Sequence, residues 1–265
     1  EIKLRHLSHL HAKKYAHWRI EIPVRTWYNV RCMLFEEAET MYKRLLLLLL
    51  CLLMMPAMAE EMADSITITF VGYCSLGDSI QYRDYEKGYH ANVAENGYGW
   101  PFEQVKDSLA ADDLTVANLE VVLTTRTAVR QQKMMNLIGD PGHVNCLVEG
   151  SIEVVSTANN HAWDFGSAGY HEMLGYLGEA GIKHFGTLYP TSDDGSDVCT
   201  VVEVKGVKFG FLGFSYPQDY DRKRITNRIK QLREDGAQVV VASLHWGTEE
   251  QPQSHSGQQS LAKYC

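Results

Sequence analysis

The chain has 265 residues, of which 45% are hydrophobic and 22% are charged. These values are typical of globular proteins, so they exclude a largely disordered or fibrous chain, and the length suits one large domain or two small ones. The formal net charge is −8, and residues 60–265, the body of the chain, carry 16 Lys and Arg against 28 Asp and Glu. This acidic body has no run of basic residues, which argues against a protein that binds nucleic-acid phosphates.

Residues 1–40 are rich in His, Arg and aromatic side chains, and they show no sustained hydrophobic period. They begin with Glu1 rather than Met, and they precede a segment with the character of an export signal. Because a signal peptide starts a protein, we predict that the natural start is Met41 and that residues 1–40 are translated upstream sequence. The alternative is a genuine cytoplasmic tail in front of a membrane anchor.

Residues 41–59 have the pattern of a secretory signal peptide. The letters MYKR precede eleven apolar residues, 45–55, and PAMA follows. Such a run is too short to span a bilayer, but it matches a signal-peptide core followed by an Ala-x-Ala cleavage site. A buried core helix is the alternative, although six consecutive leucines leave that helix without a polar face. We therefore predict an exported protein, extracellular or at the cell surface, which contacts the membrane only through this segment if it is not cleaved.

The remaining residues, 60–265, alternate between strand and helix patterns without an internal repeat or a long linker. This alternation predicts one α/β domain. Apolar, β-branched runs predict strands, and amphipathic runs with Pro near the start or Gly after the end predict helices. The predicted strands are 65–72, 114–118, 152–158, a pair turning at 205–206 within 201–213, and 237–244, and the predicted helices are 101–111, 167–180 and 221–234.

Four cysteines lie in the predicted exported body: Cys74, Cys146, Cys199 and Cys265. None of them forms a CxxC pair, which argues against a thiolate zinc site. In an oxidising compartment the four residues allow three complete pairings. Disulfides and buried free thiols both remain open alternatives.

Polar residues follow four of the predicted strands at the point where each strand ends. These segments read GYCSLGD at 72–78, NLE at 118–120, NNHAWDFG at 159–166 and HWGTE at 245–249. In α/β folds the loops beyond the carboxyl ends of strands bind ligands. One such residue alone is more often a turn former or a helix cap. Four together, offering carboxylate, amide and imidazole groups, indicate a site for Mn, Zn or Fe.

The series VGYCSLG, TVANLE, TANNHAWDFG and SLHWGTE, in this order, resembles the bacterial capsule-synthesis family, whose members are called CapA-type or poly-γ-glutamate synthesis proteins. The resemblance runs from about Ile66 to the last residue. It implies a calcineurin-like metallophosphoesterase fold, which is a two-sheet sandwich flanked by helices (α-β-β-α layers). It also implies a two-metal site at the strand ends and a role beside the capsule or poly-γ-glutamate assembly machinery, with no nucleic-acid partner.

The resemblance implies a role for each matching residue. Glu120 corresponds to the carboxylate that bridges two metals, and Asn118 holds that loop or supports the ligand. Asn160 and His245 correspond to an amide ligand and an imidazole ligand of the second metal. His161 corresponds to the general acid that protonates a leaving oxygen. Two ions a few ångströms apart can activate a water and stabilise both the attacking and the leaving oxygen of a phosphoryl centre.

Asp164 lies three residues after His161 and is counted with it among the candidate catalytic residues. Its carboxylate has two alternative roles. It orients the His161 imidazole, or it caps the helix that starts near Phe165. The neighbouring Trp163, like Trp246, is expected to pack rather than to stack on a substrate.

Two departures from the family pattern affect the metal site. Tyr73 stands where the family carries an Asp ligand of the first metal, and a phenol with a pKa of about 10 is a poor substitute for a carboxylate. The family's last motif, a Gly-His-His-Pro-His stretch, would lie beyond Cys265, so the expected sandwich is incomplete at its C-terminus. We therefore predict at most one tightly bound divalent transition metal, Mn, Zn or Fe.

Two functions of different classes follow. The first is an exported protein with a metal-dependent phosphoesterase-like site that acts in cell-surface polymer assembly. The second is a non-catalytic accessory or binding protein on the same fold, which the Tyr73 substitution favours. A secreted nucleotidase or DNA phosphodiesterase is a weaker third option, because the acidic body lacks the basic groove that polymeric nucleic acid requires.

Overall fold

The computed structural model of the chain describes residues 3–6, 18–23, 65–188, 198–217, 221–248 and 250–265. The predicted signal peptide at 41–59, and all of residues 1–40 except two short strands, lie outside these described residues. None of the helices within the described ranges combines the length and the apolar character needed to cross a bilayer.

The larger of the two main sheets has six strands in the order β1-β2-β3-β5-β8-β9. Strands β3, β5, β8 and β9 run parallel, and β1 and β2 join the edge beside β3 in antiparallel pairing. Most consecutive residues of β5 and β8, and of the first half of β3, are buried, as expected of a sheet that is covered on both sides. The strands are β1 Lys3–His6, β2 Trp18–Pro23, β3 Ser65–Cys74, β5 Leu114–Leu119, β8 Val154–Ser156 and β9 Lys183–Phe185.

The second sheet has three strands, β10 (Cys199–Val204), β11 (Val207–Ser215) and β12 (Val239–His245). Strands β10 and β11 form a hairpin, as predicted, and β12 lies parallel to β11. The hairpin turns at Lys205 and Gly206, whose φ values are 48° and 77°. Positive φ at both central residues is the geometry of a type I′ turn, which matches the twist of the flanking strands.

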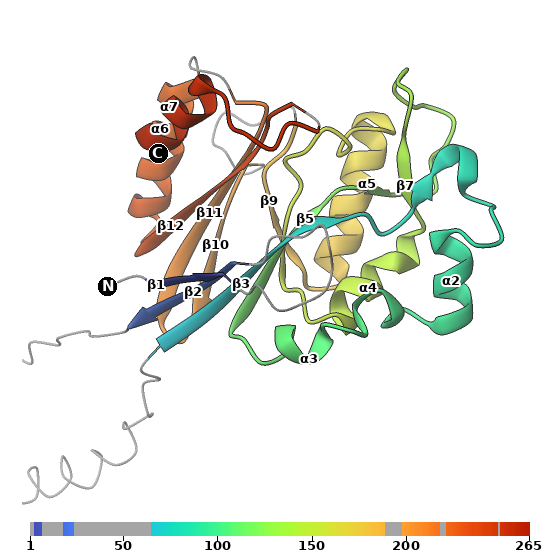
Figure 1. Ribbon diagram of the computed structural model, residues 1–265, viewed down its shortest axis with the longest axis horizontal. Coiled ribbons are helices and arrows are strands. Elements are labelled where there is room, and N and C mark those ends of the chain that lie inside the picture. The colour runs from blue at the N-terminus through green and yellow to red at the C-terminus, as the bar shows by residue number, and fades with distance from the viewer. Residues whose placement is uncertain (1–2, 7–17, 24–64, 189–197, 218–220, 249) are drawn as a thin grey trace, which may run out of the picture.

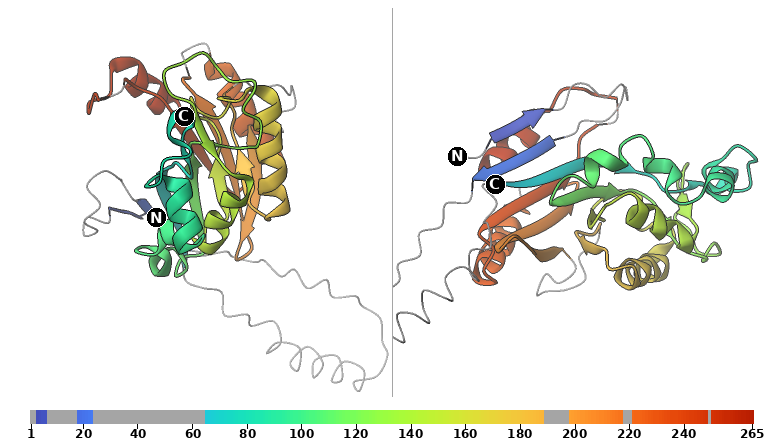
Figure 2. Two further views of the ribbon diagram at one scale, coloured as in Figure 1. Left: turned by 90° about the vertical axis from the view of Figure 1, so that its right-hand side faces the viewer. Right: turned by 90° about the horizontal axis from the view of Figure 1, so that it is seen from below.

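Helices cover the outer faces of the two sheets, which gives the α-β-β-α layers expected from the sequence (Figures 1 and 2). Helices α6 and α7 lie outside the three-stranded sheet, whereas α4 and α5 lie outside the larger one. The helices are α2 Tyr89–Asn96, α3 Lys106–Leu109, α4 Val144–Glu149, α5 Gly166–Glu179, α6 Arg222–Glu234 and α7 Ser256–Tyr264.

Three apolar clusters hold these layers together. The middle cluster lies between the sheets and includes Ile68, Val116 and Phe211, with the Phe185 ring stacked on that of Phe211 at a centroid distance of 5.5 Å. One outer cluster joins α4 and α5 to the larger sheet, and the other joins α6 and α7 to the smaller sheet. Burial of such apolar area is the main stabilising contribution to folding, at about 25 cal/mol per Å².

The segment between β3 and β5 differs from the prediction. The predicted helix 101–111 is wrong as a single element: a 3₁₀ turn at Trp100–Phe102 is followed by the four-residue helix α3. Val105, with φ −127° and ψ −9°, leaves helical geometry between the two pieces. The sequence pattern also did not predict α2, α4, or a small sheet of β4 (Asp78–Ser79), β7 (Leu137–Gly139) and β6 (Val122–Leu123) in that order.

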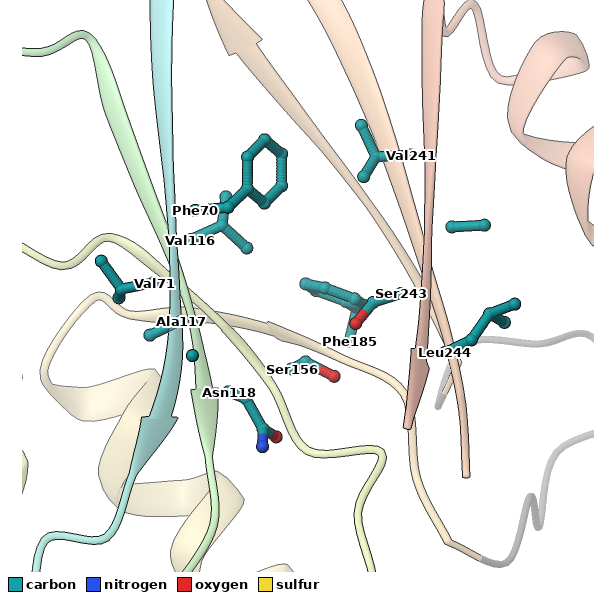
Figure 3. Close-up of a pocket in the computed structure, with 12 residues that line it drawn as sticks. Phe70, Val71, Val116, Ala117, Asn118, Ser156, Phe185, Val241, Ser243 and Leu244 are labelled. Atoms are coloured by element: carbon teal, nitrogen blue, oxygen red, sulfur yellow. The ribbon is translucent and has the colours of Figure 1, made fainter. Parts of the chain in front are cut away.

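A cavity of about 540 Å³ lies between the two sheets near the end of β12. In Figure 3 the side chains of Phe70 and Val116 face it from the larger sheet, and Val241 and Ser243 face it from β12. Asn118 and Ser156 are its polar side chains on the larger sheet. The sandwich is therefore open toward the strand ends that carry the candidate site.

Cys74, Cys146 and Cys265 are free thiols. Cys74 and Cys146 are buried, Cys199 is half-buried and Cys265 is exposed. Burial raises the pKa of Cys74 to about 12. Of the two alternatives left open by the sequence, the structure has free thiols at these three positions, Cys74, Cys146 and Cys265.

Candidate functional site

The strand-end segments converge on one cavity of about 590 Å³. The ends of β5 and β8 come from the larger sheet and the end of β12 from the smaller sheet, so the site lies where the two layers meet. Of the seven residues predicted for the site, five line this cavity, whereas Asn118 and Asp164 are not among its lining residues. Lys133 lines it as well. The lining residues are Tyr73, Glu120, Lys133, Met134, Met135, Asn160, His161, Tyr216, His245, Trp246, Gly247 and Thr248.

Glu120 follows the last residue of β5 and is buried, with 3% of its surface exposed. Its Oε2 atom accepts a hydrogen bond of 2.8 Å from Nδ2 of Asn118. Burial raises the pKa of the Glu120 carboxyl, and the nearby His161 and the Asn118 hydrogen bond partly offset that effect. A buried carboxylate whose charge is disfavoured by desolvation is stabilised by a cation beside it.

The His245 imidazole lies between two side-chain oxygen atoms. Its Nε2 atom is 3.0 Å from Oδ1 of Asn160, and its Nδ1 atom is 4.0 Å from Oε2 of Glu120. Burial lowers the pKa of His245, with His161 as a second cause. The neutral imidazole, which has a free lone pair, is the form that binds metal ions.

His161 and Asp164 form a direct contact at the start of the loop before α5. Nδ1 of His161 lies 2.8 Å from Oδ2 of Asp164, which also accepts a hydrogen bond of 2.6 Å from the Leu137 backbone N–H. The helix cap is Phe165, and no side chain caps it. Of the two roles predicted for Asp164, the structure has the contact with the imidazole and not the helix cap.

Lys133 joins this pair and was not predicted from the sequence. Its Nζ atom forms an ion pair with Oδ1 of Asp164, lies 3.2 Å from Nδ1 of His161 and donates to the Asn160 carbonyl at 2.9 Å. The Asp164 side chain is fully buried, and the ammonium supplies the positive charge that a buried carboxylate requires.

Asn159 connects two of the strand-end loops and was also not assigned a role from the sequence. Its Nδ2 atom donates to Oδ1 of Asn118 at 3.0 Å and to the Leu119 carbonyl at 2.8 Å. Its Oδ1 atom accepts a hydrogen bond of 3.1 Å from the backbone N–H of His161. This fully buried amide therefore fixes the loop that carries Asn160 and His161 against the loop that carries Glu120.

Tyr73 stands at the rim of the cavity, with 49% of its surface exposed. It lies in the irregular step between Val71 and Cys74, where the pairing of β3 with β5 shifts register. Its φ of 27° is in the left-handed region that residues other than glycine rarely adopt. A bulge of this kind redirects a side chain. Asp78, five residues on, contacts the start of α2 instead of the cavity.

The two tryptophans of the motifs differ in their surroundings. Trp163 packs on the ring of Tyr170 at a centroid distance of 5.4 Å and donates to Thr187 through Nε1 at 3.1 Å. Packing is therefore its role, as predicted. Trp246 packs against the apolar cluster under α6 and α7 and also lines the cavity.

Comparison with known proteins agrees with this arrangement. The profile of the family described as "Bacterial capsule synthesis protein PGA_cap" matches residues 67–265, which is most of the chain and includes every strand-end motif. The chain belongs to this family. Members of the family are thus expected to share the two-sheet core described above.

Two curated relatives come from Bacillus. The "PGA biosynthesis protein CapA" of Bacillus subtilis (strain 168) is 24% identical over 214 residues, which cover 76% of this chain and 54% of that protein. The "Capsule biosynthesis protein CapA" of Bacillus anthracis is 26% identical over 225 residues, covering 76% and 51%. The chain thus spans about half the length of these relatives. A crystal structure of a hypothetical protein from Thermus thermophilus aligns with a TM-score of 0.41 at 20% identity, covering 64% of this chain and 58% of that one.

Proposed function

We propose that this capsule-synthesis family protein holds one divalent transition metal in the cavity at the strand ends, here called the cleft. We further propose that His161 acts there as a general acid on a phosphoester. The observation that carries the proposal is the convergence of Glu120, Asn160 and His245. These three residues come from three strand ends, and the side-chain oxygens of Asn160 and Glu120 lie 3.0 and 4.0 Å from the His245 imidazole.

The residues present fit a metal ion. They supply one carboxylate, one amide oxygen and one imidazole nitrogen, and this mixture suits Mn, Zn or Fe. The buried Glu120 carboxylate lacks a basic partner of its own at hydrogen-bond distance among the described residues, and the burial of His245 favours its neutral form. Tyr73 supplies no carboxylate at the rim, so one ion per cleft is expected.

A divalent ion, when bound, supplies Lewis-acid activation of a water and of a phosphoryl oxygen. His161 then supplies the proton that the leaving oxygen needs. The Asp164 carboxylate only accepts hydrogen bonds, so its 2.8 Å contact requires Nδ1 of His161 to carry a proton. Nε2 is then the nitrogen that exchanges a proton with the substrate.

Lys133 and Asn159 position this acid. The ion pair of Lys133 with Asp164 holds the carboxylate that orients the ring, and Asn159 holds the backbone of His161. Tyr216, Trp246 and Thr248 also line the cavity and would lie beside the rest of the substrate. The names of the two Bacillus relatives, which refer to PGA or capsule biosynthesis, support a role for this chain in the same process, and the signal-peptide pattern of residues 41–59 supports export.

A non-catalytic binding protein is the second candidate, because one specific observation favours it. The side chain at position 73 is a half-exposed phenol where the family pattern has a carboxylate. In that case the cleft would retain an ion and bind the polymer or a partner of the assembly machinery without hydrolysing a bond.

Metal content and hydrolysis test both candidates on the full chain. After dialysis against Mn²⁺ and then metal-free buffer, elemental analysis should find about one more Mn in the wild type than in the double variant Glu120→Gln/His245→Ala. Release of p-nitrophenol from bis(p-nitrophenyl) phosphate should depend on Mn²⁺ and should fall by about 10²-fold or more in His161→Gln. The matched control is His171→Gln, an exposed histidine on α5.

Equal Mn content in the wild type and the double variant would overturn the proposed cleft site. Retention of the ion without turnover, both in the wild type and in Tyr73→Asp, would establish the binding protein in place of the hydrolase. Turnover that appears only in Tyr73→Asp would show that the phenol alone prevents hydrolysis.

A further inference from the structure

We propose a second cation site, for Zn²⁺, formed by His90, Asp140 and His143 at the start of α2. One ligand atom of each of these residues lies within 4.8 Å of the others. None of the three lines the cleft cavity that holds the candidate active site. The site therefore rests on residues that the proposed function does not use.

Local structure brings Asp140 and His143 to one side of a turn. Asp140 is the residue before the 3₁₀ turn Pro141–His143. The backbone N–H of His143 donates to the Asp140 carbonyl at 2.9 Å, which closes the turn and holds the two residues close together. The small sheet of β4, β7 and β6 places this turn beside α2, where the His90 and His143 rings lie 4.7 Å apart at their centroids.

Both imidazoles are held through Nδ1 by an outer partner, which leaves Nε2 for a ligand. Nδ1 of His90 lies 2.6 Å from Oδ2 of Asp78, and Nδ1 of His143 lies 2.9 Å from the Leu76 carbonyl. Both partners are acceptors, so each Nδ1 carries a proton toward its partner, and each Nε2 is the ring nitrogen that remains for a cation. Metal-binding histidines characteristically donate their other N–H to a carboxylate or a backbone carbonyl in this manner.

Asp78 is itself fixed, which makes the arrangement of His90 rigid. Its two carboxylate oxygens accept the backbone N–H groups of Tyr89 and His90 at 2.8 and 3.0 Å, at the first turn of α2. Nε2 of His90 is buried and has no hydrogen-bond partner among the described residues, although Oδ1 of Asp140 is only 3.6 Å away. A buried nitrogen without a partner is unfavourable, and a cation between it and the carboxylate would satisfy it.

The ligand set favours zinc. Two imidazoles and one carboxylate leave a fourth position for water, which is the arrangement of open zinc sites. Zinc–nitrogen and zinc–oxygen distances of about 2.0–2.2 Å place tetrahedral ligands about 3.3–3.6 Å apart, so the spacing of His90 and Asp140 already fits.

The charges around the site allow a cation to enter. Arg83 pairs with Oδ1 of Asp140, and the Asp140 side chain is 43% exposed, so solvent reaches the carboxylate. A zinc ion competes with the Arg83 guanidinium for that oxygen, while the Asp78 carboxylate adds a second negative charge behind His90. Removal of the Arg83 charge is therefore expected to strengthen zinc binding.

Equilibrium dialysis of the full chain carrying Glu120→Gln/His245→Ala tests this site apart from the cleft. We expect about one Zn²⁺ per chain, and binding of Co²⁺ in its place should give the intense visible absorption of a tetrahedral ion. His90→Gln and Asp140→Asn should each weaken zinc binding at least tenfold, and Asp78→Asn, which removes an outer partner, should weaken it about 10–100-fold. Arg83→Gln should bind zinc more tightly, and His171→Gln is the matched control without an effect.

Zinc binding that is unchanged in both His90→Gln and Asp140→Asn, or no zinc binding in this background, would overturn the proposal. Asp140→Asn keeps the test valid if His90→Gln fails to fold, because Asp140 is partly exposed and its amide keeps the same size. The cleft is scored separately, from the Mn²⁺ content of the chain with only His90→Gln. Failure of one site is therefore distinguishable from failure of the other.

Discussion

Replacement of Asn159 by Ala tests whether its amide joins the two loops of the candidate site. The side chain is fully buried and makes three hydrogen bonds, two of which it donates to Asn118 and to the Leu119 carbonyl. The third it accepts from the backbone N–H of His161. Alanine removes all three and leaves the Leu119 carbonyl and the His161 N–H without these partners.

The expected decrease in the free energy of unfolding follows from these contacts. A hydrogen bond contributes about 0.5–1.5 kcal/mol net, and a buried group left without its partner costs about 1–3 kcal/mol. For three bonds at one buried amide we expect the free energy of unfolding to decrease by about 2–4 kcal/mol. Urea denaturation followed by tryptophan fluorescence measures this decrease as a lower midpoint at an unchanged slope.

The matched control is Asn96→Ala, at the exposed end of α2. That amide makes one hydrogen bond, of 2.9 Å, to the Asn92 carbonyl. A surface substitution of this kind changes stability by less than about 0.5 kcal/mol. If Asn159→Ala destabilised the protein by no more than Asn96→Ala does, the reasoning that Asn159 joins the loops would be refuted.

Three further predictions concern the core and the pH dependence of stability. Phe211→Ala, in the fully buried cluster between the sheets, should cost about 3–5 kcal/mol by urea denaturation, whereas Val129→Ala, 70% exposed, should change little. In Gly213→Ala the new Cβ would lie 2.9 Å from the Cα atom of Gly186, so a loss of about 1–3 kcal/mol is expected. Gly175→Ala, in α5 with nothing within 4 Å of the new Cβ, should instead raise the melting temperature through a gain of about 0.5–1 kcal/mol. Burial lowers the pKa of His184 from 6.5, so the unfolded chain takes up the proton at a higher pH than the folded chain does. The free energy of unfolding therefore decreases as the pH drops below about 6.5. His184→Leu should make this decrease smaller. An unchanged pH slope in His184→Leu would contradict this assignment.

Much of the architecture could be predicted because the strands and long helices carry strong local patterns. The strand at 114–118 is a continuous buried run, and α5 ends where Gly181 adopts a φ of 76°. The segment 101–111 was misassigned because its apolar spacing fits a helix, while its backbone breaks at Val105. Periodicity reports which face is apolar, but it does not report whether the backbone continues through every residue.

The residues of the candidate site could likewise be predicted only where a local sequence motif marks them. Glu120, Asn160, His161 and His245 were predicted because each lies in a short motif directly after a strand. Lys133 was not predicted, because it comes from a loop 28 positions before His161 and carries no local motif. The proposed zinc cluster was not predicted for the same reason, because His90 lies on α2 whereas Asp140 and His143 share a turn much later in the chain, and the small sheet places the two segments side by side.

The burial of Cys74 gives the protein a built-in reporter of local opening. A thiol with a pKa of about 12 has about one molecule in 10⁴ in the reactive thiolate form at about pH 8. A thiol reagent is therefore expected to modify Cys74 only when the end of β3 separates from its neighbours, whereas the exposed Cys265 is accessible without such opening. Because Cys74 follows Tyr73 at the cavity rim, its labelling rate would measure how often this rim opens, and slower labelling on addition of Mn²⁺ would report ion binding without a substrate.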